Sequence, residues 1–498
     1  MRCLTVLCGP VCVAFGLLAA ANGQAAAAHR LAERPNFVLI MADDQGWGDM
    51  AYNGHPYVKT PNFDALASQA VRFDRFYAAG PVCSPTRASV MTGRTPNRSA
   101  TFKWGHPIDP REHTLATALK AAGYRTGHFG KWHLGSVQAA GKSTPGKCGF
   151  DTWISAPNFY DLDPILSDRG KAIPFKGDSS DIAADLALKF IRECAQAQQP
   201  FLAVVWFGSP HAPHQALPAD RQLYADRPDQ EAHFLGEITA MDRAVGRIRQ
   251  ELRTLGLRDN TVLWYCSDNG ALPRVGSSGG RRGAKGSIYE GGLLVPALLE
   301  WPARYPQPQV IDTPCVTCDI YPTVLEMAGL TIPHQRPLDG QSLVPILDGK
   351  TRSRTRPIGF WDHPTPGVPT PSKEWMEELY AEQQAGREPA DPVKLFAHAG
   401  TRTEVYPLDR FPGHAAWLDG VWKLHRIEVA PNGKGGKKAK GTAAGVRWEL
   451  YNLANDPTES KDLLAAEPER AQRMQAELTA WLTSVARSLN GEDYSAGP

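Results

Sequence analysis

The chain has 498 residues, of which 42% are hydrophobic and 21% are charged, as in an ordinary globular protein. This length suits two domains, or one large α/β domain with an appendage. The formal net charge of +2 lacks the basic excess of a dedicated nucleic-acid-binding protein, so no nucleic-acid partner is expected.

The first residues have the pattern of an export signal. Arg2 precedes the apolar stretch VLCGPVCVAFGLLAAA, and the small residues ANGQAAAA that follow suit cleavage. We therefore expect a signal peptide over residues 1–26 and an exported protein, periplasmic or secreted. An uncleaved anchor is the alternative, but the apolar run is short and is interrupted by Gly9, Pro10 and Gly16. No later stretch suits a membrane span, so cleavage would leave none.

Three of the nine cysteines lie in this predicted signal peptide, and the rest are too sparse for a disulfide-built scaffold. Cys315 and Cys318 form a single CxxC motif with no second pair and no nearby pair of histidines. A zinc site is therefore disfavoured, and a place in the core or a local disulfide is expected.

The body of the chain alternates predicted strands and helices. The run NFVLIMA at 36–42 is apolar throughout, as expected for a strand that is buried on both faces. Further strands are expected at 124–130, 200–208 and 261–266, and helices at 64–73, 114–123, 181–194 and 235–255. This alternation predicts an α/β fold with a central, mostly parallel sheet flanked by helices.

The pattern changes near residue 350, where a proline-rich, aperiodic segment begins. GVWKLHRIEV and VRWELYNL then read as paired strands around a lysine-rich loop, and a helix is expected over 467–489. We expect a catalytic domain over 34–350 and a smaller C-terminal α+β domain, with a small antiparallel sheet and a closing helix, over 351–498.

The stretch PVCSPTRASVMTGR places a cysteine next to a predicted helix start. Ser84 suits the N-cap, Pro85 suits the first helical position and Gly93 suits the end, so Cys83 would stand just before the helix. Unpaired N–H groups and Arg87 would make this an anion site and would acidify the thiol. A half-buried structural cysteine or a disulfide partner is the alternative.

Polar residues follow four of the predicted strands, at the sheet edge where ligands bind in open α/β folds. In chain order they are Asp43 and Asp44, then Lys131 and His133, then His211 and His214, and finally Asp268 and Asn269. Taken alone, the DD and SDNG segments are also common turn sequences, and the histidines can be structural.

Together, these residues indicate a metal and an anion. Carboxylates and an amide suit a hard cation, and calcium is favoured over magnesium because it accepts a crowded shell of protein oxygens. Five side chains would hold a tetrahedral oxyanion, namely Arg87, Lys131, His133, His211 and Lys285. The glycines around Lys285 do not have the spacing of a phosphate-binding P-loop, which disfavours a nucleotide site.

These segments carry a resemblance to a known family. CSPTRASVMTGR resembles the sulfatase signature, with a threonine at 86 where many members have serine. NFVLIMADDQGWGD, GKWHLG, SPHAPH, SDNGA and KGSIYEGG appear in the family's order, and WELYNLANDPTESKDL is similar to its C-terminal ending. The resemblance spans residues 34–465 and implies an alkaline-phosphatase-like core.

The resemblance also implies a modified nucleophile. In this family the signature cysteine, here Cys83, is oxidised to Cα-formylglycine by a separate maturation enzyme that acts on the unfolded chain. One hydroxyl of the hydrated aldehyde attacks sulfur and the alcohol of the substrate leaves. The other hydroxyl is then deprotonated, sulfate is expelled and the aldehyde is regenerated.

By the same motif match, each site residue acquires an expected role. Arg87 would orient the hydrate, Lys131 would neutralise sulfate, His133 would be the base for sulfate release, and His211, assisted by Lys285, would protonate the leaving oxygen. The expected Ca²⁺ ligands are Asp43, Asp44, Asp268, Asn269 and the formylglycine at 83.

The expected substrate is a sulfated small molecule or glycan, most simply a carbohydrate, since the chain has an export signal and polar aromatic loops. Ser155 and His214 are further candidates for substrate contact, and so are residues of the 355–420 region: Trp361, His363, Trp375, His414 and Trp417. For that region, ordinary packing is the alternative. Rival functions are a phosphonate or phosphate ester hydrolase on the same core, or a sulfated-glycan-binding protein without turnover.

Overall fold

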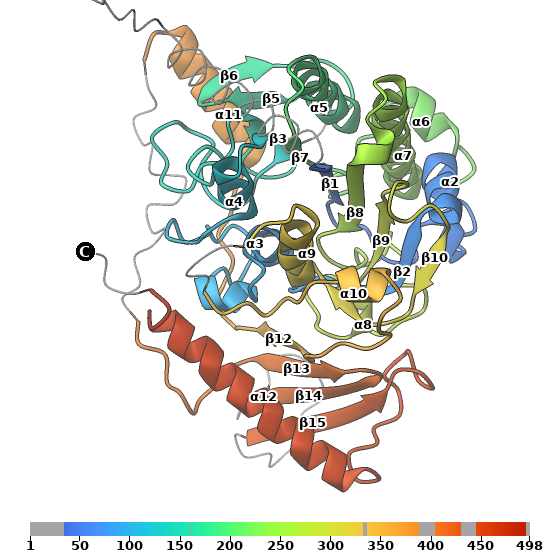
Figure 1. Cartoon of the computed structure of the whole chain (residues 1–498), viewed down its shortest axis with the longest axis vertical. Coiled ribbons are helices and arrows are strands. Elements are labelled where there is room, and N and C mark those ends of the chain that lie inside the picture. The colour runs from blue at the N-terminus through green and yellow to red at the C-terminus, as the bar shows by residue number, and fades with distance from the viewer. Residues whose placement is uncertain (1–33, 161, 332–335, 388–403, 430–444, 495–498) are drawn as a thin grey trace, which may run out of the picture.

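Figure 1 shows the computed structural model of the chain. It describes residues 34–160, 162–331, 336–387, 404–429 and 445–494. The predicted signal peptide lies outside these ranges. Within them, no helix combines the length and the apolar character that crossing a membrane requires.

A large mixed sheet forms the centre of the molecule (Figure 1). Its eleven strands lie in the order β10-β2-β9-β8-β1-β7-β3-β4-β5-β6, with β11 beside β2. Strands β8, β1, β7, β3 and β4 are parallel, and antiparallel pairs flank them on both sides. The strand bounds are β1 Asn36–Ala42, β2 Val71–Tyr77, β3 Arg125–Lys131, β4 Thr152–Ala156, β5 Ile165–Asp168, β6 Lys171–Pro174, β7 Phe201–Trp206, β8 Thr261–Ser267, β9 Leu294–Glu300, β10 Gln309–Ile311 and β11 Cys315–Val316.

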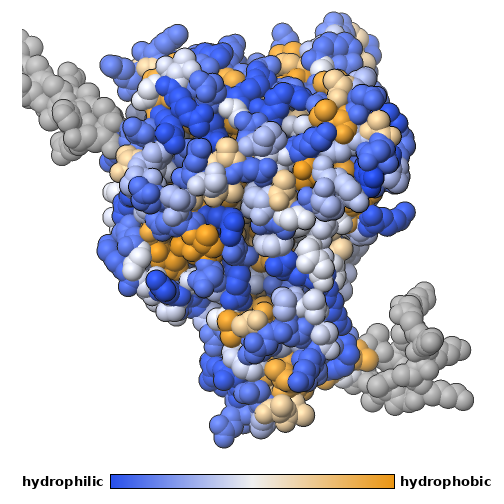
Figure 2. Space-filling view, turned by 90° about the vertical axis from the view of Figure 1, so that its right-hand side faces the viewer, coloured by the Kyte–Doolittle hydropathy of each residue, from blue (hydrophilic) through white to orange (hydrophobic). Residues whose placement is uncertain are grey.

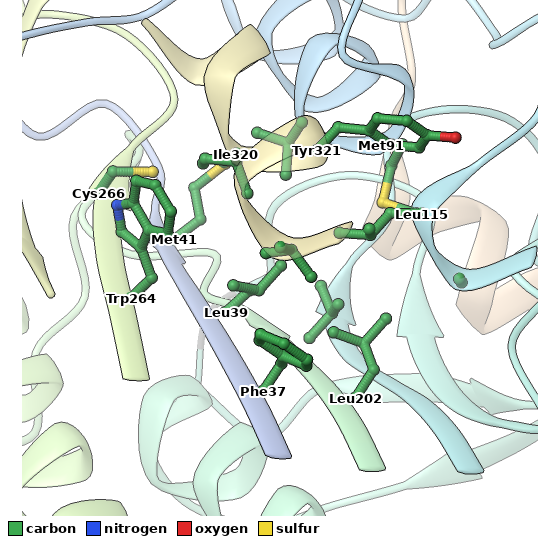
Figure 3. Close-up of a cluster of buried hydrophobic side chains, with 14 of the residues drawn as sticks. Phe37, Leu39, Met41, Met91, Leu115, Leu202, Trp264, Cys266, Ile320 and Tyr321 are labelled. Atoms are coloured by element: carbon green, nitrogen blue, oxygen red, sulfur yellow. The ribbon is translucent and has the colours of Figure 1, made fainter. Parts of the chain in front are cut away.

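Strand β1 is buried along its whole length, as its apolar sequence predicts. Alternate side chains enter two separate cores because successive residues of a strand point to opposite faces. Phe37 and Met41 belong to one core, which Figure 3 shows, whereas Val38 and Ile40 belong to the other. The central sheet is therefore covered on both faces, which confirms the predicted fold class.

The helices form a layer on each face. One layer contains α3 Cys83–Thr92, α4 Leu115–Ala121, α9 Ile320–Met327 and α10 Val344–Leu347. The other contains α2 Pro61–Gln69, α5 Ser179–Gln196 and α7 Asp229–Thr254. The remaining helices of this body are α6 Pro218–Gln222, α8 Glu290–Leu293, α11 Ser372–Gln384 and the 3-10 turns η1 Ala51–Asn53, η2 Pro96–Ser99, η3 Arg258–Asn260 and η4 Thr317–Asp319.

The predicted helix over 64–73 is wrong at its C-terminal end. Helix α2 ends at Gln69 because Ala70 is extended, with φ −128° and ψ −167°. Strand β2 begins at Val71 and pairs antiparallel with β9. The tertiary pairing thus overrides the helical spacing of the local sequence.

The start of α3 also differs from the prediction. The helix begins at Cys83 itself and its N-cap is Val82, whereas Ser84 lies inside the first turn. The Ser84 hydroxyl accepts a hydrogen bond from Gly105 N at 2.9 Å, so it serves a neighbouring loop rather than the helix end. Gly93 ends the helix as predicted, with φ +70°.

A second, four-stranded antiparallel sheet lies below the main body in Figure 1. Its strands are β12 Ile358–Asp362, β13 His414–Asp419, β14 Trp422–Val429 and β15 Gly445–Asn452, and α12 Pro468–Leu489 packs across it. Figure 2 shows that the molecule narrows where this part joins the body. The paired strands and the closing helix are confirmed, whereas β12 and β13 lie where no strand is predicted.

Cys315 and Cys318 are buried free thiols. The expected place in the core is confirmed, and the alternative of a local disulfide is wrong.

Candidate active site

The polar residues at the strand ends meet at one edge of the main sheet. Asp43 and Asp44 follow β1, Asp268 follows β8 and Lys131 is the last residue of β3. Because these strands run parallel, their C-terminal ends lie on the same side. Asp268 N donates a hydrogen bond to Ala42 O at 3.2 Å, which holds the ends of β8 and β1 together.

The backbone at Asp44 lets neighbouring aspartates serve one site. Its φ is +69°, in the left-handed region that side chains rarely adopt. Asp44 N donates to Asp268 Oδ1 at 3.0 Å, and Asp44 Oδ1 accepts from Asn269 Nδ2 at 2.9 Å. The turn therefore joins the two strand ends through carboxylate and amide groups.

Each carboxylate of the site has a cationic partner. The Arg87 guanidinium lies 2.7 Å from Asp268 Oδ2, and Lys131 Nζ lies 2.5 Å from Asp43 Oδ2. Lys285 Nζ lies 2.6 Å from Asp44 Oδ2. Lys285 is 19% exposed, whereas the other five side chains have no exposure. The site is thus a compact, nearly dry cluster of matched charges.

Arg87 lies one turn into α3 from Cys83 and is held on two sides. Its guanidinium stacks over the Trp206 ring at 5.1 Å, and it donates to Lys131 O at 3.1 Å. Burial alone would lower the pKa of Arg87, but the charges of Asp268 and Asp43 raise it, so the cation is permanent. It is therefore a fixed positive charge beside residue 83.

Cys83 is only 1% exposed and is unpaired. Burial raises the pKa of its thiol to about 12, because Lys131 and Lys285 do not offset the loss of solvent and Asp43 and Asp268 add to the rise. The expected acidified thiol is therefore wrong. The alternatives of a half-buried cysteine and a disulfide partner are also wrong, and an unmodified Cys83 would be a poor nucleophile at neutral pH.

The donor set fits a hard cation. One ligand atom each from Asp43, Asp44, Cys83 and Asp268 lies within 4.8 Å of the others. Within the described residues, the buried Asp43 Oδ1 and Asn269 Oδ1 have no hydrogen-bond partner, so both oxygens remain open to a ligand. Burial and the charge of Asp43 also raise the pKa of Asp268 to about 7. A bound cation would favour the ionised carboxylate and lower that pKa again. The sulfur of Cys83 is the one soft donor in this set.

His133 lies beside these groups and is 2% exposed. Neither ring nitrogen has a hydrogen-bond partner among the described residues, which is rare for a buried imidazole. Burial, reinforced by the charges of Lys131 and Arg87, lowers the pKa of His133 well below its ordinary value. The ring is therefore neutral, and its surroundings disfavour the protonated form.

His211 is on the open side of the cluster and is 19% exposed. Its Nδ1–H donates to Ala212 O at 2.5 Å, so Nε2, 3.5 Å from Asp44 Oδ2, carries the lone pair of the neutral ring. The ring stacks on Phe159 with centroids 4.3 Å apart. Burial lowers the pKa of His211 to about 3.

The other predicted substrate residues make contacts elsewhere. Ser155 Oγ pairs with His128 Nδ1 at 2.8 Å, and His214 Nδ1 lies 3.3 Å from Glu237 Oε2. His363 stacks on Phe102, and His414 Nε2 pairs with His425 Nδ1 at 2.9 Å. Trp361 and Trp417 are buried in the core beneath α12, which is the packing alternative, and Trp375 is half-buried on α11.

The structure adds two residues that the sequence analysis missed. Trp206 supports the guanidinium of Arg87, and Phe159 supports the ring of His211. The position of Trp206 at the end of a predicted buried strand was a usable signal, since the next residues belong to the SPHAPH motif. Nothing in the local sequence marks Phe159.

The family model for sulfatases matches residues 35–330 of the chain. The chain is 31% identical to N-acetylgalactosamine-6-sulfatase of Canis lupus familiaris over 401 residues, which cover 71% of this chain and 73% of that protein. It is 32% identical to arylsulfatase G of Rattus norvegicus over 395 residues, which cover 68% and 72% of the two chains.

Solved structures share the fold. The crystal structure of Ps i-CgsB superposes with a TM-score of 0.74 at 23% identity, covering 93% of this chain and 97% of that one. Phosphonate monoester hydrolase of Agrobacterium radiobacter has a TM-score of 0.56 at 22% identity, covering 92% and 96%. With the signature segment at the N-terminus of α3 and the acidic cluster at the sheet edge, these matches show that the chain belongs to the sulfatase family and is a sulfuric ester hydrolase.

Proposed function

We propose that this sulfatase hydrolyses sulfate esters of carbohydrates with a Ca²⁺ ion held by Asp43, Asp44, Asp268 and Asn269 and with Cys83 converted to formylglycine. The observation that carries the proposal is the cluster in which donor atoms of these acids and of residue 83 lie within 4.8 Å of one another. A hard cation prefers oxygen ligands, so an oxygen-bearing derivative of Cys83 suits this cluster better than the thiol.

The charges of the site support an anionic substrate. Asp43, Asp44 and Asp268 are matched by Lys131, Lys285 and Arg87, so the two positive charges of a bound Ca²⁺ would be uncompensated. When bound, the ion would polarise the sulfate oxygens. The hydrated aldehyde of formylglycine would supply one hydroxyl for attack on sulfur and a second for release of sulfate.

The two histidines differ in ways that suit different proton transfers. His133 has two unpartnered nitrogens and a lowered pKa. The negative charge of a bound sulfate group would raise that pKa and allow His133 to accept the proton of the second hydroxyl. His211 faces the open side. Its Nδ1 carries the hydrogen of the neutral ring, so its Nε2 is unprotonated. The negative charge of a bound sulfate ester would raise the low pKa of His211, so that Nε2 takes up a proton from solvent on the open side and donates it to the leaving oxygen. Lys285, next to it, stabilises that oxygen.

One similarity and one expectation from the sequence support a carbohydrate substrate. The similar N-acetylgalactosamine-6-sulfatase is named for a sulfated sugar. The export signal expected at the N-terminus would place the enzyme in the periplasm or outside the cell, after modification by the maturation enzyme, where sulfated glycans are met. The alternative substrate is a phosphonate or phosphate ester, since a hydrolase of that class shares the fold.

The chemistry is tested with Cys83→Ser, and Cys148→Ser serves as control because Cys148 is another buried free thiol. Wild-type protein should carry formylglycine at residue 83 by peptide mass spectrometry and release sulfate from a monosaccharide sulfate. Cys83→Ser should release about one alcohol per chain and then stall with a sulfo group on residue 83, because a serine has no second hydroxyl to expel sulfate.

Cys148→Ser should keep steady turnover. Steady turnover of Cys83→Ser at the wild-type rate, or an unmodified thiol in fully active protein, would refute the formylglycine proposal. Faster cleavage of 4-nitrophenyl phosphate than of 4-nitrophenyl sulfate would favour the alternative substrate class.

A further inference from the structure

The site opens beside His211 and Lys285, which are the exposed members of a cluster whose other charged groups have no exposure. The alcohol half of a sulfate ester must therefore extend past these two residues. Phe159 stacks on His211 and bounds the opening on that side. Asn158, the neighbour of Phe159 in the chain, contacts the residues that lie beyond this side of the opening.

Asn158 leads from this opening to a segment of the proline-rich region. Its Nδ2 donates to Thr370 O at 3.1 Å. Asn158 is only 8% exposed. Its Oδ1 is buried and has no hydrogen-bond partner among the described residues. Asn158 therefore ties the Phe159 side of the opening to this segment.

The same segment returns to the start of α3. Val368 N donates to Trp104 O at 3.0 Å, and Gly105 N donates to the hydroxyl of Ser84, the residue after Cys83. The segment 366–370 therefore runs from the His211 side of the site to the Cys83 side. It forms a rim within the 355–420 region that the sequence analysis singled out, although not at the residues named there.

Trp104 lies on this rim, and its side chain is partly exposed to solvent. It is 38% exposed, and its neighbour Val368 is 39% exposed. Gly367 packs so closely under the indole that a Cβ there would lie 2.2 Å from the Trp104 Cε2 atom. Backbone thus supports one part of the ring while the rest stays accessible. A tryptophan held in this way offers a fixed aromatic surface on which the apolar face of a ligand can stack.

The charges near the indole are already paired. Lys103, which precedes Trp104, forms an ion pair with Asp362. His106 Nε2 pairs with Pro366 O at 3.0 Å. The rim therefore presents an apolar face beside charges that are already paired, which suits an uncharged ring better than a second anionic group.

We infer that Trp104 and Val368 form a subsite for a neutral sugar ring in the alcohol half of the substrate, with the ring stacked on the indole of Trp104. This inference rests on the proposed function, because it assumes that the substrate is a carbohydrate sulfate. It assigns specificity to a rim built from both the 100–106 loop and the 366–370 segment.

The test compares Trp104→Ala and Trp104→Phe with wild type on the best-cleaved member of a panel of monosaccharide sulfates, with inorganic sulfate as competitive inhibitor. Trp104→Ala should raise KM about tenfold with little change in kcat, and Trp104→Phe should restore most of the affinity. The inhibition constant of inorganic sulfate should not change, since sulfate alone occupies only the buried cluster. Tyr57→Ala is the matched control, because Tyr57 is another exposed aromatic residue.

Three results would overturn the inference. They are an unchanged KM in Trp104→Ala, a parallel rise of KM and of the sulfate inhibition constant, and a wild-type enzyme that cleaves 4-nitrophenyl sulfate but no sugar sulfate. The second would mean that Trp104 acts through Ser84 and the start of α3. A wild type that cleaves no sulfate ester at all would instead contradict the proposed function, so the two failures are distinguishable.

Discussion

Lys423 of the small C-terminal sheet forms a buried ion pair with Glu290 of the main body, with Nζ 2.8 Å from Oε1. Lys423 Nζ also lies 3.2 Å from Glu459 Oε1, and Glu459 Oε2 accepts a hydrogen bond from Glu290 N. Glu290 begins α8, five residues after Lys285. The C-terminal sheet thus holds the segment that carries a cation of the active site.

Lys423→Met should therefore lower both stability and activity. The change leaves two buried carboxylates without their cation, which costs about 3–5 kcal/mol of unfolding free energy in comparable cases. It should also lower kcat, because Lys285 loses its support. Denaturant unfolding and steady-state kinetics measure the two effects, with the exposed Lys461→Met as control.

The link to Lys285 is tested in a double-mutant cycle. If Lys423 acts through Lys285, Lys423→Met should lower kcat further by less than about twofold in a Lys285→Ala background. Fully additive losses in the folded variants would show that the two lysines act independently.

Asp268→Asn should reduce bound calcium and activity together. The substitution removes a charge from the expected ligand set while keeping the shape of the side chain. We expect metal affinity and kcat each to fall by about 100-fold or more. Metal analysis of dialysed protein and sulfate release measure them. Asp242→Asn is the control, since Asp242 is a buried acid that accepts hydrogen bonds from Asn62 and Phe63. Full calcium content in active Asp268→Asn would remove Asp268 from the ligand set.

His211→Gln should discriminate between leaving groups. A sugar alcohol needs a proton to leave, so its release should slow by roughly a hundredfold to ten-thousandfold. The 4-nitrophenolate ion leaves without a proton, so the loss for 4-nitrophenyl sulfate should be below about tenfold. His214→Gln is the control, because His214 faces Glu237, and it should affect both substrates equally. Equal losses for both substrates in His211→Gln would mean that the acid is another group.

The docking of α12 should weaken in acid. Asp339 pairs with Arg98 at 2.8 Å and accepts a hydrogen bond from Trp481 at 3.0 Å. Burial alone would raise the pKa of Asp339, but Arg98 and these hydrogen bonds lower it below the ordinary value of an aspartate. An acid whose pKa is lower in the folded state stabilises above its unfolded pKa and loses that contribution as the pH falls through the folded value.

Melting temperatures of wild type and Asp339→Asn should therefore differ at pH 7 and converge below about pH 4. A constant difference across this range would show that the charge of Asp339 contributes nothing to the docking.

The sequence predicted the parts of the fold that depend on burial along a single segment. Strand β1 was predictable because its apolar run needs no partner to be recognised. Strands β12 and β13 were not, because β13 forms by pairing with β14 and β12 forms by pairing with β13, which lies about fifty residues further along the chain. The end of α2 at Gln69 depends in the same way on β9, which lies far along the chain.

The site shows a similar division. The residue types and their places at strand ends predicted which groups would meet. The environment of each group was not predictable, because it is set by what surrounds it in three dimensions. Cys83 was expected to be acidified by a helix start, yet burial raises its pKa to about 12. Trp361 and Trp417 were candidates for a sugar contact, with packing as the alternative, and they fill a core, whereas Trp104 was not a candidate and is exposed on the rim.

The burial of α3 has a consequence for biosynthesis. Every residue from Cys83 to Thr92 is inaccessible in the folded protein, so another protein can reach the cysteine only before this helix packs. The conversion proposed for Cys83 and the folding of the chain therefore compete in time. A molecule that folds before conversion keeps its thiol and is permanently inactive. The yield of active enzyme then depends on the ratio of the conversion rate to the folding rate, so slower folding in the cell raises the yield.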